Sequence, residues 1–478
     1  MDQSTESFVN LCVFHILDGL CRGLSLFSGP TRAALIYALE GDDPVRVYDP
    51  QGLLRGHEPI LEEVFLRSGR WTGAGIVDLR PFEQNAEGLQ LSGLITFGAR
   101  SSQPFYQMWF TEHHPDLCST GPTERWLEQA AWQLTQELGT RNVLCVGTAG
   151  HVLHNYARHA VRDHIVDERV VAMGPDTQLR IYPILDTILA VSRTPEEGFW
   201  PMGRLVFAEP GTSPLAGLVV SFPEMERPLV DNAKHVRKML QAVENPEYYL
   251  ASDGLTIAGI GRGPAPRFSL TADFQRSHGF LYLEDQPVCS FTDGHFRSTN
   301  RRAKLVQLEE CLLESKMSSE ARHDLFRVTA DIVHHAQALG RGCGLVVDLR
   351  EKPTPLSGQH LDVPLDLLRP GGLDLAKSLA MLDGALHIGA DLKVHGFACL
   401  LDGLAVAGEN RARGARFNSA LRFTAVHESM IVVAVSADRP VAIIQGGVEL
   451  TARCEWKPVW ACSATPPLLG RWLKDQSL

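Results

Sequence analysis

LDGALHI (382–388) places an acid and a glycine directly before an apolar run, and two further segments, GARFNSALRF (414–423) and MIVVAVS (430–436), follow it. An acid and a glycine at a strand edge, a polar loop with an arginine and a second strand are how an α/β domain builds a phosphate-and-metal site. The Asp383 carboxylate can hold a divalent cation, and Gly384 lets the backbone approach a ligand. The planar guanidinium of Arg416 can bind phosphate oxygens through paired donors. Asp-Gly-Ala is also an ordinary turn tripeptide, so the order of the segments matters more than any one of them.

These segments, in this order, resemble the diadenylate cyclase domain, which is the nucleotide-binding domain of DNA-integrity-scanning proteins and of their membrane-bound relatives. That family carries an Asp-Gly-Ala motif, then a Gly-Thr-Arg-His-Arg loop, then a strand that ends in Val-Ser. The corresponding stretches are LDGALHI, GARFNSALRF and VVAVS (432–436), and GRGCGLVVDL (340–349) resembles the family's glycine-rich entry into a core strand. The resemblance extends over residues 320–446.

The resemblance implies an α/β fold, with a mixed-sheet C-terminal domain, and an enzyme that joins two ATP molecules into cyclic di-AMP. It implies catalytic roles for Asp383, Gly384 and Ala385, with Asp383 holding Mg²⁺ or Mn²⁺. The residues it implies for nucleotide and phosphate binding are Gly414, Ala415, Arg416, Phe417, Asn418, Ser419 and Ser436. The reaction joins two half-sites face to face, so a homodimer or higher homo-oligomer is expected.

The second motif departs from the family pattern. Ala415 stands in place of the family threonine, Phe417 in place of the histidine and Asn418 in place of the second arginine. Losing a charge-assisted phosphate contact costs about 1.5–3 kcal/mol, which weakens a cyclase without excluding nucleotide binding. A non-catalytic receptor for a nucleotide or cyclic dinucleotide, or a purely structural scaffold, therefore stays open. Phe417 could stack on a purine or pack internally, and Ser436 could donate to phosphate or cap its strand.

Patterns of hydrophobicity divide the chain into five regions. Residues 1–139 read as an α+β sensor-like region that opens with an amphipathic helix and closes with a helix at 123–139, and residues 140–244 as its second, α/β part. Strands are expected at 33–39, 45–50, 75–82, 88–98, 141–147, 180–192, 203–210 and 216–222. Residues 245–318 read as a β-rich linker, 319–450 as the cyclase-like domain and 451–478 as a tail that packs on the surface or on a partner subunit. The first two regions resemble the sensor region that is often fused to diadenylate cyclase domains.

The amino-acid composition limits the kinds of partner that the protein is expected to bind. The 478 residues are 44% hydrophobic and 21% charged, with a formal net charge of −11, so a nucleic-acid partner is not expected. The N-terminus is polar and acidic, and charged residues interrupt its apolar segment (8–27), so a cytoplasmic protein without a membrane span is expected. The ten cysteines form no Cys-x-x-Cys pair, and the 18 histidines show no metal-binding motif of the His-Glu-x-x-His type.

Overall fold

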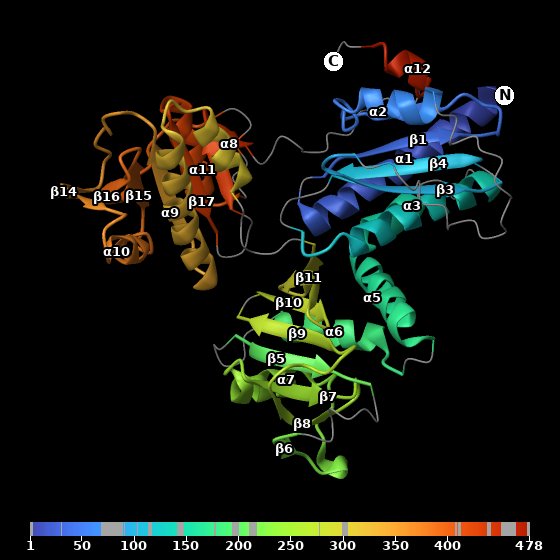
Figure 1. Ribbon diagram of the computed structural model, residues 1–478, viewed down its shortest axis with the longest axis horizontal. Coiled ribbons are helices and arrows are strands. Elements are labelled where there is room, and N and C mark those ends of the chain that lie inside the picture. Colours follow the sequence, from blue (N-terminus) through green and yellow to red (C-terminus); the bar gives the residue numbers. More distant parts are fainter. Residues whose placement is uncertain are drawn as a thin grey trace. The chain divides into compact units, whose positions relative to one another are not determined.

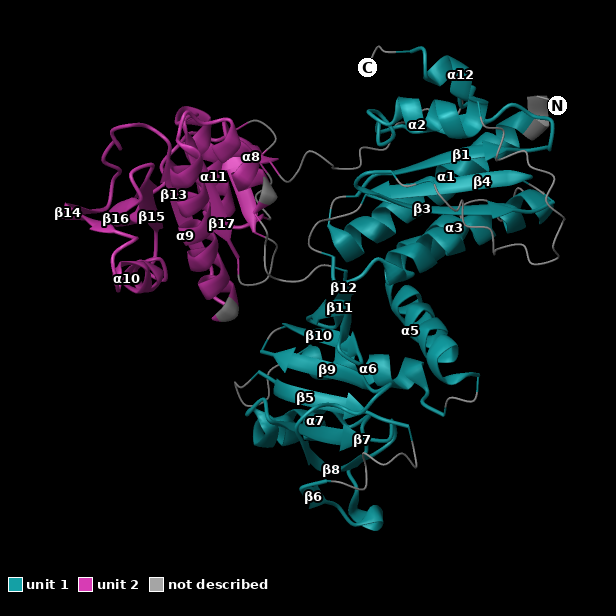
Figure 2. Ribbon diagram, in the orientation of Figure 1, with its two compact units in different colours: residues 1–300, 455–478 teal, residues 301–454 magenta. Residues whose placement is uncertain are grey.

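The computed structural model describes residues 3–29, 31–67, 89, 91–102, 104–112, 117–140, 148–175, 178–193, 200–209, 218–276, 278–298, 305–406, 409, 413–436, 441–450 and 465–475. The chain forms two compact units (Figure 2). Unit 1 contains residues 1–300 and 455–478, and unit 2 contains residues 301–454. The strands expected at 75–82 and 141–147 lie outside the described residues.

The first part of unit 1 is a four-stranded antiparallel sheet, in the order β2-β1-β4-β3, with helices on its faces (Figure 1). Its elements are α1 (Gln3–Ser28), β1 (Ala33–Ala38), β2 (Arg46–Tyr48), α2 (Glu58–Glu62), the π-helix η1 (Glu63–Arg67), β3 (Leu94–Arg100), β4 (Tyr106–Glu112), α3 (Gly121–Thr140), α4 (Thr148–His154) and α5 (Ala157–Met173). Side chains alternate along a strand. Leu35 and Tyr37 of β1 therefore join the cluster that contains α1 and α3, while Ile36 joins the cluster that contains α2.

Helix α1 is long and apolar enough by composition to cross a membrane, and 61% of its most apolar window is buried within the protein. Residues at helical spacing, among them Val13, Leu17 and Leu24, are at most 1% exposed and pack in the core of unit 1. The amphipathic helix expected at 8–27 is therefore present as a core helix.

The C-terminal tail returns to this sheet. The amide of Val47 donates to the carbonyl of Pro467 at 3.0 Å, and the amide of Leu469 donates to the carbonyl of Val45 at 2.9 Å. Helix α12 (Leu469–Trp472) buries Trp472, whose ring lies 4.0 Å from the guanidinium carbon of Arg55. The tail was expected to pack on the protein's own surface or on a partner subunit. Its described residues, 465–475, pack on their own chain.

The second part of unit 1 is an eight-stranded sheet in the order β12-β11-β10-β9-β5-β7-β8-β6. Its elements are α6 (Ile181–Ser192), β5 (Met202–Phe207), β6 (Val220–Ser221), the 3-10 helices η4 (Glu224–Glu226) and η5 (Gln241–Val243), α7 (Ala233–Leu240), β7 (Tyr248–Ser252), β8 (Ile257–Arg262), β9 (Leu270–Gln275), β10 (His278–Leu283), β11 (Gln286–Thr292) and β12 (His295–Arg297). The prediction of a strand at 180–192 is wrong, because this segment forms α6. Its β-branched residues favour a strand locally, but Ile184, Ile188 and Val191 recur at helical spacing and are fully buried.

Unit 2 is a mixed seven-stranded sheet between helices, in the order β14-β16-β15-β13-β17-β18-β19. Its elements are α8 (Val306–Leu313), α9 (Ser319–Ala338), β13 (Cys343–Asp348), β14 (Gln359–Asp366), α10 (Gly372–Leu379), β15 (Ala385–Gly389), β16 (Lys393–Cys399), α11 (Ala415–Val426), β17 (Met430–Val435), β18 (Ala442–Gln445) and β19 (Val448–Glu449). β13 and β15 run parallel, whereas β13 and β17 run antiparallel. This confirms the mixed α/β fold expected for the C-terminal domain.

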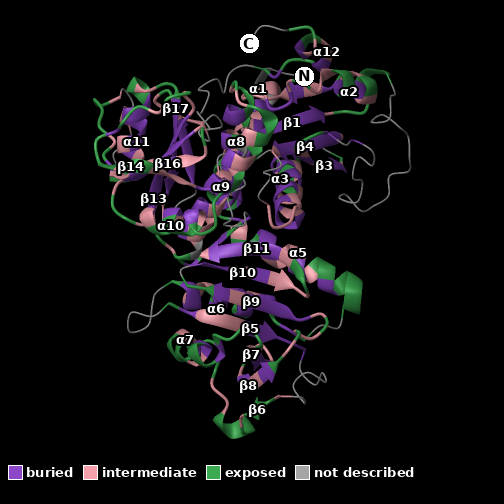
Figure 3. Ribbon diagram, turned by 60° about the vertical axis from the view of Figure 1, so that its left-hand side comes forward, coloured by how far each residue is buried: buried purple, intermediate pink, exposed green. Residues whose placement is uncertain are grey.

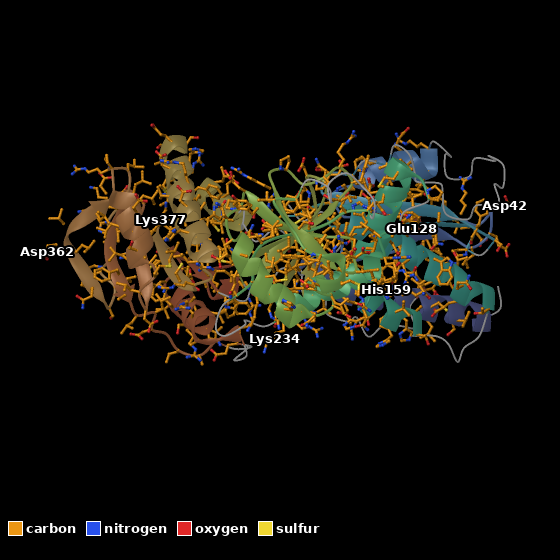
Figure 4. The ribbon with its side chains drawn as sticks, turned by 90° about the horizontal axis from the view of Figure 1, so that it is seen from below. Asp42, Glu128, His159, Lys234, Asp362 and Lys377 are labelled. Carbon is orange, nitrogen blue, oxygen red and sulfur yellow. The ribbon has the colours of Figure 1, made fainter. Side chains whose placement is uncertain are left out.

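The central strands of unit 2 are buried on both faces (Figure 3). Leu345 and Val347 of β13 pack with α8, α9 and α10, while Val346 packs on the opposite face with α11. The edge strand β14 is exposed, and Asp362 extends from it at the outer end of the unit (Figure 4). The face that carries α11 also carries the candidate site.

Candidate active site

A cavity of about 510 Å³ opens where β13 and β15 begin, β17 ends and α11 begins. This volume lies within the range of about 300–1,000 Å³ typical of small-ligand sites. The lining residues are Gly344, Asp383, Gly384, Ala385, Cys399, Leu400, Leu401, Arg413, Gly414, Ala415, Arg416, Phe417, Ser419, Ala434, Val435, Ser436 and Ala442. Nine of the ten residues expected at the site therefore lie together, and Asn418 is the exception.

Asp383 and Gly384 immediately precede β15. The Asp383 side chain is fully exposed, and its Oδ1 accepts a hydrogen bond from the Gly384 amide at 3.1 Å. Gly384 has φ +101°, and a Cβ at this position would lie 2.6 Å from the carbonyl carbon of Ala398. Glycine is therefore required here by the close approach of β16, whereas the sequence suggested an approach to a ligand.

Arg416 lies in the first turn of α11, whereas the sequence suggested a polar loop at this position. The helix begins after Gly414, which has φ +91° and so favours glycine. The first N–H groups of a helix lack an acceptor within it and carry partial positive charge, so the turn from Ala415 to Phe417 is electropositive. The guanidinium of Arg416 reaches from this turn to within 3.8 Å of Asp383. The expected acid and guanidinium thus converge at one cavity.

Apolar atoms form much of the remaining wall. Burial raises the pKa of Cys399, which lines the cavity, to about 11, so this group is a neutral thiol near pH 7. Burial likewise raises the pKa of Cys343, the first residue of β13, to about 12, although the nearby charge of Arg416 opposes that rise. Neither thiol is activated as a nucleophile. The wall of Cys399, Leu401 and Ala442 can instead accept an apolar or aromatic group.

A family model described as "DisA bacterial checkpoint controller nucleotide-binding" (DAC) matches residues 355–448, which include every expected site residue. The C-terminal domain belongs to the DAC family. Models described as "Probable sensor domain DACND" and "Probable sensor domain DACNH" match residues 7–175 and 182–289. The resemblance of the N-terminal half to sensor regions that accompany DAC domains is thereby confirmed.

Two solved structures are similar to part of this chain. DacA from Staphylococcus aureus, in the form of a double mutant, is 15% identical with a TM-score of 0.22, covering 27% of this chain and 87% of its own. A hypothetical membrane spanning protein from Bacillus cereus is 14% identical with a TM-score of 0.21, covering 30% of this chain and 85% of its own. No curated protein sequence matches.

Asn418 differs from the other expected residues of the DAC domain site. It is 7% exposed, it does not line the cavity, and its Oδ1 has no hydrogen-bond partner among the described residues. Because the position falls on the inner face of α11, its side chain cannot replace the arginine of the family motif at the cavity. Helical periodicity from Gly414 onward could have revealed this, since Asn418, Leu421 and Thr424 are all buried at helical spacing.

Sequence reasoning did not single out Arg413 as a site residue. Its side chain lines the cavity beside the first turn of α11. The sequence feature that points to it is the basic cluster of Arg411, Arg413 and Arg416, in which the structure describes Arg413 and Arg416.

Asp383 fits a divalent cation only in combination with a ligand. Among the described residues, no group of three or more His, Cys, Asp or Glu side chains could hold a metal ion. Mg²⁺ is commonly held by one or two carboxylates together with substrate phosphates, so one exposed carboxylate beside a phosphate site is compatible with such binding.

Proposed function

We propose that this protein is a sensor-regulated nucleotidyltransferase of the diadenylate cyclase type, which condenses two ATP molecules into cyclic di-AMP. The observation that carries the proposal is the convergence of Asp383 and Arg416 at one cavity within a DAC domain. In the reaction, each ribose 3′-hydroxyl attacks the α-phosphate of the other ATP. Two phosphodiester bonds form, two pyrophosphates leave and two protons are released.

The residues of the cavity have distinct proposed roles. Arg416 donates hydrogen bonds to phosphate oxygens, and the first turn of α11 adds positive potential at the same point. Ser419 and Ser436 supply hydroxyl groups at the cavity wall, and the apolar wall around Leu401 receives the base. Asp383 would hold Mg²⁺ or Mn²⁺ together with substrate phosphates, and the cation would neutralise charge on the α-phosphate. Asp383 itself orients the attacking hydroxyl.

One cavity accommodates one half of the reaction, so two copies of the domain must present their sites to each other. We therefore propose a homodimer or higher homo-oligomer, in which the sensor domains control how often the two sites meet.

The test is product formation by the full chain. Purified protein is incubated with ATP and Mg²⁺ or Mn²⁺, and products are identified by mass spectrometry. Cyclic di-AMP should form, and Asp383→Ala should lower its rate by about 10³-fold, equivalent to about 4 kcal/mol of transition-state stabilisation. Asp362→Ala, which removes an exposed acid that does not line the cavity, serves as the control and should retain full activity. Absence of product from wild-type protein that binds ATP would reject the proposal.

A non-catalytic receptor is the second candidate, and the position of Asn418 favours it. The cavity lacks the second arginine of the family loop, and the side chain that replaces it is buried away from the cavity. Calorimetry discriminates the two functions, because a receptor would bind cyclic di-AMP tightly and leave ATP unchanged.

A further inference from the structure

Arg413 is a second cationic side chain at the cavity. It directly precedes Gly414, outside helix α11, and its side chain is 31% exposed. Its guanidinium carbon lies 4.1 Å from the centroid of the Phe417 ring, and its Nη2 donates to Oε1 of Glu449 at 2.6 Å. One aromatic face and one carboxylate therefore hold the side chain in place.

These contacts leave donors of Arg413 available to a ligand. A guanidinium carries five N–H donors in a rigid plane, and the carboxylate of Glu449, which is 11% exposed, accepts one of them. The Phe417 ring packs against a face of the plane, where an arginine makes no hydrogen bonds. Phe417, at the histidine position of the family motif, thus supports a cation beside the cavity.

The charge balance of the cavity indicates what this arginine binds. Among the described residues, the charged ones that line it are Asp383, Arg413 and Arg416. Arg416 already lies near Asp383, and Asn418 adds neither charge nor a donor to the cavity. A ligand with several negative charges would need a second cation, and Arg413 is the other described cationic side chain of the lining. Its pairing with Glu449 at 2.6 Å offsets part of its charge but leaves N–H donors for phosphate oxygens.

We propose that Arg413, positioned by Phe417, is the second polyphosphate-binding residue of this site and supplies the contact that Asn418 cannot. The inference rests on the proposed nucleotide site, and it specifies a ligand with a polyphosphate chain. Arg413 contacts the phosphates rather than the base, so its contribution is larger for a triphosphate than for a monophosphate.

The experiment measures binding of inorganic tripolyphosphate, ATP and AMP to the full chain by calorimetry. Arg413→Gln should lower the affinity for tripolyphosphate and for ATP by roughly 10- to 100-fold, and the affinity for AMP by less. Arg369→Gln removes the same charge from an arginine of unit 2 that is 82% exposed and does not line the cavity, and it should change binding by less than about twofold. Arg413→Lys keeps a cation near Glu449 but lacks the planar fork, so it should weaken binding by an intermediate factor. It also serves as a second variant in case Arg413→Gln fails to fold.

A double-mutant cycle tests the positioning role of Phe417. Phe417→Leu should lower the affinity for tripolyphosphate in the wild-type background. It should have no further effect on that affinity in the Arg413→Gln background, because the ring acts through the arginine. Additive effects of the two substitutions would overturn that role.

The outcomes separate this inference from the cyclase proposal. Tripolyphosphate affinity that depends on Arg413, in a protein that forms no dinucleotide, keeps the inference and rejects the cyclase. Dinucleotide formation with unchanged ATP and tripolyphosphate affinity in both Arg413 variants keeps the cyclase and overturns the inference. Wild-type protein that binds no tripolyphosphate also overturns it.

Discussion

Two acid–arginine pairs lie at opposite ends of the parallel strands β13 and β15, and their environments are opposite. Asp348 ends β13, is fully buried and accepts hydrogen bonds from Nε and Nη2 of Arg350 at 2.8 and 2.7 Å. Its oxygens also accept from the amides of Arg350 and Thr354. Asp383, before β15, is fully exposed and lies 3.8 Å from Arg416, beyond hydrogen-bond distance.

The difference separates a structural pair from a candidate binding pair. The acceptor positions of Asp348 are occupied by its own chain, so nothing remains for a ligand. Asp383 and Arg416 instead present acceptors and donors to a cavity. Residue type alone does not distinguish the two pairs, because each consists of an aspartate and an arginine in unit 2. Burial and hydrogen-bond saturation decide between them.

Removing the acid from each pair should have opposite consequences for stability. Asp348→Ala leaves Arg350 and the surrounding amides without their acceptor and should lower the free energy of unfolding by about 3–5 kcal/mol. Asp383→Ala should change it by less than about 0.5 kcal/mol, because the side chain is fully exposed. Urea denaturation measures both changes, and hydrogen exchange in β13 and β17 assigns them to unit 2. Equal stability losses in the two variants would contradict the distinction.

Acidification should weaken the pair that contains buried Asp348. Burial would raise the pKa of Asp348, but hydrogen bonds from Arg350, together with the ring of His387 at 3.4 Å, outweigh it and hold the pKa well below its usual range. The folded state therefore binds the proton less readily than the unfolded state, in which the pKa is about 3.9. This contribution to stability is complete above that pH and is lost as the pH falls toward the folded pKa.

The comparison is between wild type and Asp348→Asn, unfolded by urea from pH 7 down to acid conditions. The difference in stability should stay constant above about pH 4 and shrink below it. A difference that grows on acidification would contradict the depressed pKa of Asp348.

The sequence predicted the candidate site better than it predicted local structure. The motif segments at 382–388, 414–423 and 430–436 belong to elements that do meet, because β15, α11 and β17 surround one cavity. The predictions that were wrong concern local conformation that depends on tertiary packing. The segment 181–192 carries β-branched residues, yet its spacing of buried positions makes it helix α6, and the expected loop at 415–419 is the first turn of α11.

The roles of individual side chains were harder to derive, for the same reason. Asn418 was grouped with the binding residues because it stands at the second arginine of the family loop and can donate a hydrogen bond, but helical geometry turns it inward. Arg413 was noted only as part of the basic cluster of Arg411, Arg413 and Arg416 that borders the expected phosphate loop, and it was not named as a site residue, although it lines the cavity. A linear motif gives the order of residues, whereas the direction of each side chain follows from the helix that the motif begins.

Conservative substitution of each arginine gives the smallest and most discriminating effects. Lysine keeps the positive charge but cannot form the planar, paired contact. Arg350→Lys should therefore cost about 1 kcal/mol of stability, through the weakened contact to buried Asp348, and leave ATP affinity unchanged. Arg416→Lys should weaken ATP binding by a comparable free energy, about fivefold in affinity, and leave stability unchanged, because its guanidinium faces the cavity. Thermal unfolding and calorimetry on both variants measure the two quantities. If Arg350→Lys also lowered ATP affinity, the buried pair would be coupled to the cavity through β13 and β15, and the two ends of these strands could no longer be treated as independent.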